Sequence, residues 1–310
     1  MTKEKIYVWV SDYSNFTGEG NLAKMFIKYR LQQFYEIKIC QLKKDTFFKK
    51  KILNYKYLIP FVGILNIWKF HLLKKKTCYL NYLPLWNFFI FLLLPSKTLL
   101  GPITGGSKFK NDFSTNYFIR KLLFPILYRL SSKIIIYRKF KTVFATDLLK
   151  NNLDNKLIIK SEFNFILSGL KKNKYVKTKK NIDFLIYYRK HKNKLNLYPI
   201  KFIKRLLMYN FNIYVIGDQL NIFGVKNLGF VNRIKLNDIL SKSKFSILSG
   251  ENILSLFLVE CLNSNVKIIS NEKIIKINKN IKKNFVYFNT NKFFKRSEID
   301  FQLKKAYIEK

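Results

Sequence analysis

The chain has 310 residues, 48% of them hydrophobic, which is enough material for two α/β domains with a core each. Its 59 Lys and Arg against 18 Asp and Glu give a formal net charge of +41, and such a surface attracts the phosphate groups of nucleotides, nucleic acids or anionic lipids. The 3 Cys lack a close pair and the 2 His are too few, which excludes a disulfide framework, a cysteine zinc site and a His-based metal site.

The high charge has a second explanation in the composition itself. Lys, Asn, Ile, Phe and Tyr are all frequent, and these residues have A/T-rich codons. The charge therefore supports a phosphate-bearing partner without identifying it. The N-terminal sequence runs directly into a strand-like segment, without the apolar stretch of a signal peptide, and the cysteine usage suits a reducing compartment. We therefore expect a cytoplasmic protein.

Short β-rich runs alternate with helical ones, which predicts parallel sheets connected by helices. In the first half the sequence predicts helices over 21–34 and 117–131, and strands over 6–10, 36–41, 77–82, 97–100 and 133–137. The most apolar segment, LPLWNFFIFLLL (83–94), is shorter than the roughly 20 residues that span a bilayer. It is either a buried helix or an interfacial one, and the strands on both sides favour the buried helix.

The second half begins after a basic, polar stretch, residues 169–181, which we take as a linker between domains. Beyond it the sequence predicts strands over 182–187, 212–216, 227–231, 245–248 and 266–270, with helices between them. We therefore predict an N-terminal Rossmann-like domain over 1–168, a C-terminal one over 182–290 and a terminal helix over 291–310.

Four motifs of the second half follow one another in a characteristic order. They are YYRKHKNK with Arg189 and Lys194, the strand end IYVIGD, the run NLGFVNRIKLNDILSKSKFSILSG, and SGENILSLFLVECLNSNVKIIS with Glu251 and Glu260. In order and spacing they resemble the C-terminal, donor-binding domain of GT-B glycosyltransferases, especially glycosyltransferase family 4. The resemblance implies the GT-B fold, two Rossmann-like domains that face each other across a cleft.

The resemblance also implies roles for individual residues. Arg189 and Lys194 would stabilise the leaving diphosphate, since a planar guanidinium and an ammonium supply fixed cations. Glu260 would accept hydrogen bonds from the ribose, and Glu251 would lie near the transferred sugar. Backbone amides from Asn252 to Ser255 would hold the diphosphate at a helix start.

The chain departs from the family pattern between the two glutamates. Eight residues separate them instead of the usual seven, and the glycines normally found there are missing. For Arg189 and Lys194 the alternative is a solvated basic loop, and for the two glutamates it is an ordinary surface position. Asn232 and Arg233 follow the strand where the family commonly binds the nucleobase.

Two glycine-containing loops of the first half are candidate ligand loops. TGEGN carries Gly18 and Gly20, with Asn21 as the expected helix cap, and a simple tight turn explains it as well. GPITGGS contains Gly101, Pro102, Gly105 and Gly106 at a strand end. An inverting enzyme would need a base from this half, and the local acids are Asp12, Glu19 and Asp112.

The sequence thus predicts a glycosyltransferase that moves a sugar from a nucleotide-diphosphate sugar to a glycan or polyprenyl-linked acceptor in surface polysaccharide synthesis. We expect no cofactor beyond this donor substrate, and no metal, because the chain has no Asp-x-Asp triplet. Peripheral contact with an anionic membrane at its inner face is expected from the basic and aromatic residues. The alternatives are a nucleic-acid-binding protein, without a specific motif for it, an epimerase of nucleotide sugars and a non-catalytic relative.

Overall fold

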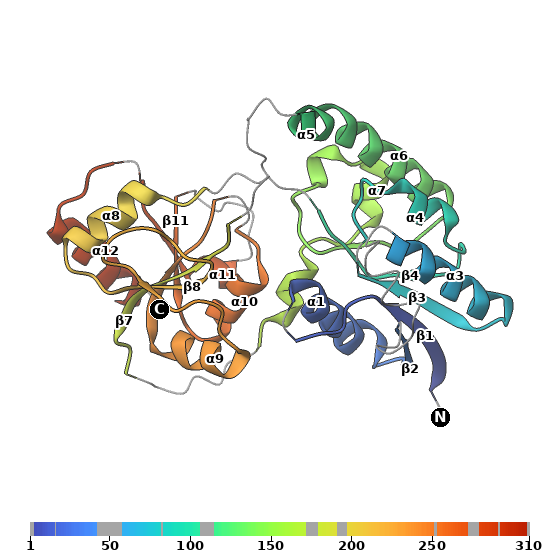
Figure 1. Ribbon diagram of the computed structural model, residues 1–310, viewed down its shortest axis with the longest axis horizontal. Helices are drawn as coiled ribbons and strands as arrows, with labels where there is room; N and C mark the ends of the chain where they lie inside the picture. Colours follow the sequence, from blue (N-terminus) through green and yellow to red (C-terminus); the bar gives the residue numbers. More distant parts are fainter. Residues whose placement is uncertain are drawn as a thin grey trace. The chain divides into compact units, whose positions relative to one another are not determined.

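The computed structural model describes residues 3–15, 17–41, 58–81, 83–105, 115–171, 179–190, 197–250, 253–271, 279–290 and 292–308. The chain forms two compact units that divide between Ser168 and Gly169 (Figure 1). Each unit contains a parallel sheet with helices connecting its strands. The predicted fold class, α/β with two Rossmann-like domains, is confirmed.

The sheet of the N-terminal unit has the strand order β2-β1-β3-β4. All neighbours are parallel, and Val8 of the central strand lies opposite both Ile39 and Cys78. Ile6 and Val10 are fully buried, as expected of a strand covered on both faces. A second, two-stranded sheet follows. The strands are β1 (Glu4–Val10), β2 (Tyr35–Cys40), β3 (Lys76–Leu80), β4 (Leu99–Leu100), β5 (Pro102–Ile103) and β6 (Val143–Phe144).

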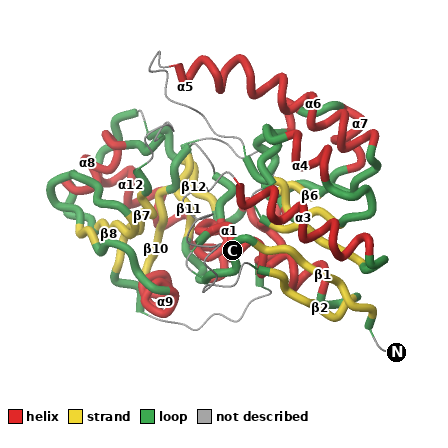
Figure 2. The backbone as a smooth tube through the Cα atoms, turned by 45° about the vertical axis from the view of Figure 1, so that its right-hand side comes forward, coloured by secondary structure: helices red, strands yellow, loops and turns green. Residues whose placement is uncertain are grey.

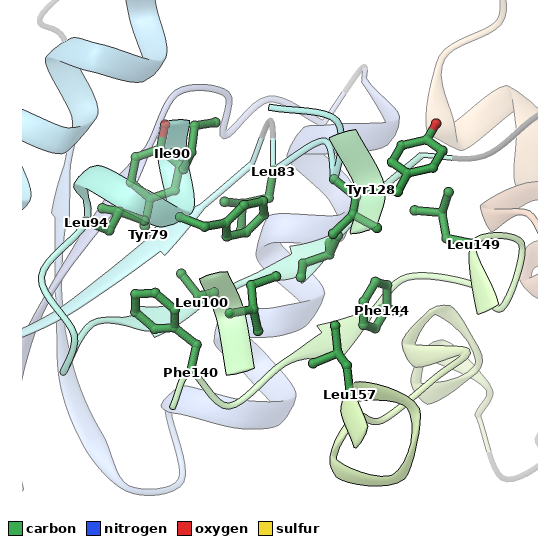
Figure 3. Packing of buried hydrophobic residues seen from close by; sticks show 14 of the residues in the cluster. Tyr79, Leu83, Ile90, Leu94, Leu100, Tyr128, Phe140, Phe144, Leu149 and Leu157 are labelled. Carbon is green, nitrogen blue, oxygen red and sulfur yellow. The ribbon is translucent and has the colours of Figure 1, made fainter. Parts of the chain in front are cut away.

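The helices of this unit are α1 (Gly18–Phe26), continued by a π-helical turn (Ile27–Leu31), α3 (Ile59–Leu72), α4 (Phe88–Leu93), α5 (Thr115–Phe118), continued by a π-helical turn (Ile119–Leu123), α6 (Phe124–Tyr137) and α7 (Asn155–Lys160). Short 3-10 turns lie at Lys150–Asn152 and Phe165–Gly169. Figure 3 shows Tyr79 of β3, Leu100 of β4, Phe144 of β6 and Leu157 of α7 in one apolar core.

Three predictions in this unit need correction. Residues 133–137 form the last turns of α6 instead of a strand, because Ile135 continues the buried side of that helix. Helix α1 begins at Gly18 with Thr17 as its cap, not at Asn21. The apolar segment is helical only over Phe88–Leu93, and within this helix Ile90 is buried whereas Leu92 is exposed.

The sheet of the C-terminal unit has the strand order β12-β11-β10-β7-β8-β9, all parallel. Read from β9, this is the Rossmann order 3-2-1-4-5-6. The strands are β7 (Ile182–Tyr188), β8 (Ile213–Gly217), β9 (Lys226–Asn227), β10 (Ser243–Ile247), β11 (Lys267–Ser270) and β12 (Phe285–Tyr287). The helices are α8 (Ile200–Met208), α9 (Arg233–Lys242), α10 (Leu256–Asn263), α11 (Lys279–Lys282) and α12 (Arg296–Ile308).

The core of this unit is aromatic. Phe184 of β7, Phe202 of α8 and Phe288 after β12 are fully buried and belong to one cluster. The predicted strand 227–231 exists only as β9, because Gly229 turns the chain with φ 68° directly after it. Strand β12 was absent from the sequence prediction.

Candidate functional site

The order of strands in the C-terminal unit marks one place where a ligand can enter. From β7 the chain continues to β8 on one side, whereas from β10 it continues to β11 on the other. In open α/β sheets the segments that leave two such strands diverge, and ligands bind in the crevice between them; here that crevice is expected between the segments after β7 and β10. We call this place the carboxyl-edge site; its residues are Arg189, Asp218, Arg233, Gly250, Ser255 and Glu260.

Arg189 directly follows β7, and hydrogen bonds to Asp218 fix the backbone on both sides of it. The carboxylate of Asp218, which follows β8, accepts a hydrogen bond from the Lys190 amide at 2.7 Å. The Asp218 amide donates to the Tyr188 carbonyl at 2.9 Å. The Arg189 side chain itself is exposed, and within the described ranges it has no hydrogen-bond or ion-pair partner. Its guanidinium is therefore open to solvent.

The segment after β10 is tied across the crevice to the segment after β7. The Gly250 amide donates to the Leu197 carbonyl at 2.9 Å. Helix α10 then begins behind Ser255, whose hydroxyl accepts a hydrogen bond from the Leu258 amide at 3.1 Å. Phe257 in the first turn packs against Tyr187 of β7 with ring centroids 5.3 Å apart. The amino end of α10, with its partial positive charge, thus lies at the crevice.

Removal of the Ser255 cap is expected to weaken the C-terminal unit. Ser255→Ala leaves the Leu258 amide without its acceptor and lowers the free energy of unfolding by about 1 kcal/mol. Urea unfolding followed by far-ultraviolet circular dichroism measures this change. Ser255→Asn is the matched control, because asparagine caps helices as well as serine does; equal stability of all three proteins would contradict the capping role.

Glu260 lies one turn further along α10 and pairs with Arg233 at the start of α9. The Arg233 Nη2 to Glu260 Oε1 distance is 3.1 Å, and the Glu260 side chain is only 20% exposed. Burial raises the pKa of Glu260, and the Arg233 guanidinium opposes part of that rise. Asn232 caps α9 with its side-chain oxygen on the Lys235 amide at 2.9 Å. The structure therefore brings two candidate residues, Arg233 and Glu260, into direct contact.

Five of the predicted residues, Lys194, Glu251, Asn252, Gly106 and the candidate base Asp112, lie outside the described residues. Arg189, Ser255 and Glu260 all lie on elements that meet at the carboxyl edge of the C-terminal sheet. The supporting residues Asp218 and Gly250 are the last residues of the motifs IYVIGD and NLGFVNRIKLNDILSKSKFSILSG, but neither of them was given a role from the sequence. Asp218 directly follows β8 and Gly250 lies three residues after β10, and these positions are the signal that points to them.

In the N-terminal unit, Gly18 and Gly20 form the first turn of α1. A Cβ at Gly20 would lie 2.3 Å from the Ser14 carbonyl oxygen, so this glycine lets the preceding loop approach the helix. At Gly20 the close approach to the Ser14 backbone fits the tight turn, and the ligand role of Gly18 and Gly20 stays a prediction. Gly105 lies two residues after β5, has φ 129° and is exposed.

The Asp12 carboxylate is hydrogen-bonded within the loop before α1, where it was a candidate base. It accepts hydrogen bonds from the Thr17 hydroxyl at 2.5 Å and from the Ser14 amide at 2.8 Å. Burial raises the pKa of Asp12, but the hydrogen bonds from Thr17 and Ser14, together with the positive charge of Lys24, outweigh burial, and the pKa is lowered. A lowered pKa makes a weaker base, so the Asp12 carboxylate fits a structural role better than proton abstraction.

Asn81, at the end of β3, joins this loop to the sheet and carries no sequence motif. Its side-chain amide donates to the carbonyls of Asp12, at 2.9 Å, and Glu19, at 3.0 Å. Among the described residues, the buried Oδ1 of Asn81 and the hydroxyl of Ser11 have no hydrogen-bond partner. Both follow neighbouring strands, β1 and β3, at the carboxyl edge of the N-terminal sheet.

The described part of the chain was also compared with the requirements of a metal site and of a membrane-spanning helix. No group of three or more His, Cys, Asp or Glu side chains is arranged there as metal ligands would be. None of the helices in these residues combines the length and hydropathy needed to cross a membrane.

Comparisons with known proteins give similarity at the level of the fold. No protein-family model and no curated protein matches the chain. Similar solved structures include the glycosyltransferase WaaG, involved in lipopolysaccharide biosynthesis, at 10% identity and TM-score 0.46, covering 97% of this chain and 90% of that one. The UDP-GlcNAc 2-epimerase from Methanocaldococcus jannaschii is 13% identical at TM-score 0.47, covering 99% and 92%. The T4 phage BGT mutant in complex with UDP-glucose is 12% identical at TM-score 0.45, covering 98% and 90%.

Proposed function

We propose that the protein is a glycosyltransferase that transfers a sugar from a nucleotide-diphosphate sugar to a glycan or polyprenyl-linked acceptor, in the synthesis of a surface polysaccharide. The observation that carries the proposal is the carboxyl-edge site. An exposed arginine follows β7 and a capped helix start follows β10, on the two sides of the crevice of a Rossmann-type sheet.

The reaction breaks the bond between the anomeric carbon and the diphosphate oxygen, and the diphosphate keeps the electron pair. A hydroxyl of the acceptor forms the new bond to the anomeric carbon, and its proton is released to the solvent. The added negative charge on the diphosphate is stabilised by Arg189, through two parallel hydrogen bonds, and by the amino end of α10. Lys194 supplies a further cation in this proposal. Their interactions with the diphosphate are stronger in the transition state, where its negative charge has grown, than in the ground state, and this difference lowers the activation barrier of transfer.

Glu260 recognises the ribose in this proposal, because an ionised carboxylate accepts hydrogen bonds from both hydroxyl groups. Arg233 holds Glu260 in its ionised form against the effect of burial. Contact with an anionic membrane at the cytoplasmic face belongs to the same proposal, since a polyprenyl-linked acceptor lies at a membrane surface.

The ion pair leads to a prediction about pH. A carboxyl group with a raised pKa takes up its proton at a higher pH than usual, and a protonated Glu260 accepts one hydrogen bond fewer from the ribose. Arg233→Ala removes the opposing cation and raises this pKa further. We expect the affinity of Arg233→Ala for the nucleotide to fall at a higher pH than that of the wild type, when calorimetric titrations run from about pH 7.5 down to about pH 5.

The control for this titration is Glu260→Gln, which cannot ionise and whose affinity is expected to be low and independent of pH over the same range. Identical pH profiles for the wild type and Arg233→Ala would show that the ion pair does not control nucleotide binding.

The test of the function is a thermal-shift screen of the purified protein against UDP, GDP, CMP and their common sugar conjugates. A ligand that binds only the folded state raises the melting temperature by mass action. The conjugate that gives a shift is then incubated with candidate acceptors, and the products are analysed. A new glycoside supports transfer, and an epimer of the donor sugar supports the epimerase instead. No shift with any nucleotide, together with salt-dependent binding to generic DNA, would replace the proposal by the nucleic-acid alternative.

A further inference from the structure

The N-terminal unit carries a broad exposed apolar surface on three of its helices. On α3 the exposed residues Phe61, Leu65, Trp68 and Leu72 follow one another at spacings of three and four, which places them on one side of the helix. The inner side of α3, with Ile64 and Ile67, is buried. We call the whole surface, with the π-helical turn that leads into α6, the α3–α4–α6 face; its residues are Phe61, Leu65, Trp68, Leu72, Phe89, Leu92, Leu93, Leu122, Leu123, Ile126 and Leu130.

Hydrogen bonds and ring contacts join the three helices. The Trp68 indole of α3 donates to the Leu93 carbonyl of α4 at 2.7 Å. The Arg138 guanidinium, directly after α6, donates to the carbonyls of Leu92, at 2.5 Å, and Leu94, at 2.6 Å. Trp86 stacks on Phe124 of α6 with ring centroids 5.7 Å apart. Helices α3 and α6 each contact α4 in the N-terminal unit (Figure 1), so the exposed residues of the three helices lie on adjoining parts of this unit.

The helical stretch 115–137 has two different sides. Helices α5 and α6 follow each other along one continuous run (Figure 2). Tyr128, Ser131 and Ile135 are buried, and Ser131 bonds to the Leu85 carbonyl before α4 at 2.5 Å. Leu122 and Ile126 on the other side are 65% and 61% exposed. A helix that packs with one apolar side and exposes another has a second apolar partner.

The charges on these helices favour one class of partner. Lys121, Arg129 and Lys133 are exposed on the same stretch, and Asp112 is the only acidic residue of the sequence between Asp45 and Asp147. A surface that combines exposed leucine, phenylalanine and tryptophan with lysine and arginine, and without acidic residues on its helices, complements an apolar phase under a negatively charged layer. A phospholipid membrane with anionic headgroups has both properties.

We infer that the α3–α4–α6 face is the surface through which this protein lies on an anionic membrane, with Leu65, Leu72, Leu122 and Ile126 inserted below the headgroups and the nearby cations among them. The inference deepens the membrane contact of the proposed function by naming the face that makes it. Binding to lipid is measured without any sugar nucleotide, so its failure and the failure of the transferase proposal are separate results.

The experiment is co-sedimentation of the full chain with vesicles made of equal parts phosphatidylcholine and phosphatidylglycerol. Leu122→Glu/Ile126→Glu removes two inserted side chains and adds two negative charges, and we expect roughly hundredfold weaker binding. Leu65→Glu/Leu72→Glu on α3 is expected to have a similar effect, because both pairs lie on one face. These four side chains are exposed, so the substitutions are expected to leave the melting temperature unchanged.

The matched control is Met208→Glu/Phe223→Glu, which changes the same charge at two highly exposed apolar side chains of the C-terminal unit. It is expected to bind the vesicles as the wild type does. Loss of binding in the control as well would show that net charge alone holds the protein on the vesicles. Equal binding to vesicles of phosphatidylcholine alone would overturn the role of the cations. Failure of the wild type to sediment, with a dimer in analytical ultracentrifugation that Leu122→Glu/Ile126→Glu abolishes, would assign the face to a second copy of the chain.

Discussion

Replacing Arg189 by alanine is expected to reduce sugar transfer by roughly a hundredfold to a thousandfold, with little change in the melting temperature. The loss follows from the removal of a fixed cation that faces the diphosphate, a group whose charge grows in the transition state. The fold is spared because the Arg189 side chain is exposed and has no partner within the described part of the C-terminal unit. Initial rates with the donor found in the nucleotide screen, together with thermal unfolding, measure both effects.

Two further variants separate the role of Arg189 from a general effect of charge. Lys204→Ala removes one positive charge from the exposed side of α8 and is expected to have the wild-type rate. Arg189→Lys keeps the charge but loses the planar fork, so its rate is expected to lie between those of the wild type and the alanine variant. A wild-type rate in Arg189→Ala would remove this residue from the site.

The fold could be predicted from the sequence wherever the apolar residues of a segment follow one clear pattern and turn-forming residues mark its ends. Strands β7, β8 and β10 are such segments, because each is a short apolar run that ends at polar or glycine residues. Residues 133–137 were wrongly predicted as a strand since KIIIY is rich in β-branched residues, whose preference is overruled by packing in α6. Strand β12, at three residues, is too short to give a periodic signal.

The candidate site could be predicted in its elements but not in its contacts. As predicted, Arg189 directly follows β7 and Ser255 directly precedes α10. Both lie at the same edge because a parallel sheet brings the carboxyl ends of its strands together. The pair of Arg233 and Glu260 could not be predicted, since it depends on how α9 and α10 pack against each other. The same holds for the Asp218 carboxylate, which reaches back to the Lys190 amide.

The second large effect is expected for Gly217→Ala, which should lower the free energy of unfolding of the C-terminal unit by about 3 to 5 kcal/mol. Gly217 ends β8 with φ 95°, a conformation that side chains rarely adopt. A Cβ at this position would also lie 2.3 Å from the Tyr188 carbonyl oxygen. That carbonyl accepts the hydrogen bond from the Asp218 amide, so the backbone must move at the point where Arg189 leaves β7.

Gly224→Ala separates the two causes. Gly224 has nearly the same backbone angle, φ 91°, but an added Cβ would meet only Leu207 side-chain atoms, at 3.4 Å and beyond. Its cost is therefore the conformational one alone, about 1 to 2 kcal/mol. The 3 tryptophans of the sequence, Trp9, Trp68 and Trp86, all lie in the N-terminal unit. Tryptophan fluorescence therefore follows that unit, and circular dichroism follows both.

With these two probes, urea unfolding of Gly217→Ala is expected to show an early transition in circular dichroism and an unchanged one in fluorescence. Suppose that Gly217→Ala lowers the free energy of unfolding no more than Gly224→Ala does. The close contact with the Tyr188 carbonyl would then not contribute to stability, and the backbone around Arg189 would not depend on β8. If Gly217→Ala costs more, and nucleotide binding falls with it, then the close approach of β8 to the end of β7 is what holds Arg189 in place. A cation on a surface loop binds phosphate weakly, whereas one on a fixed backbone is positioned before the substrate arrives. The glycine would then contribute to transfer without touching either substrate.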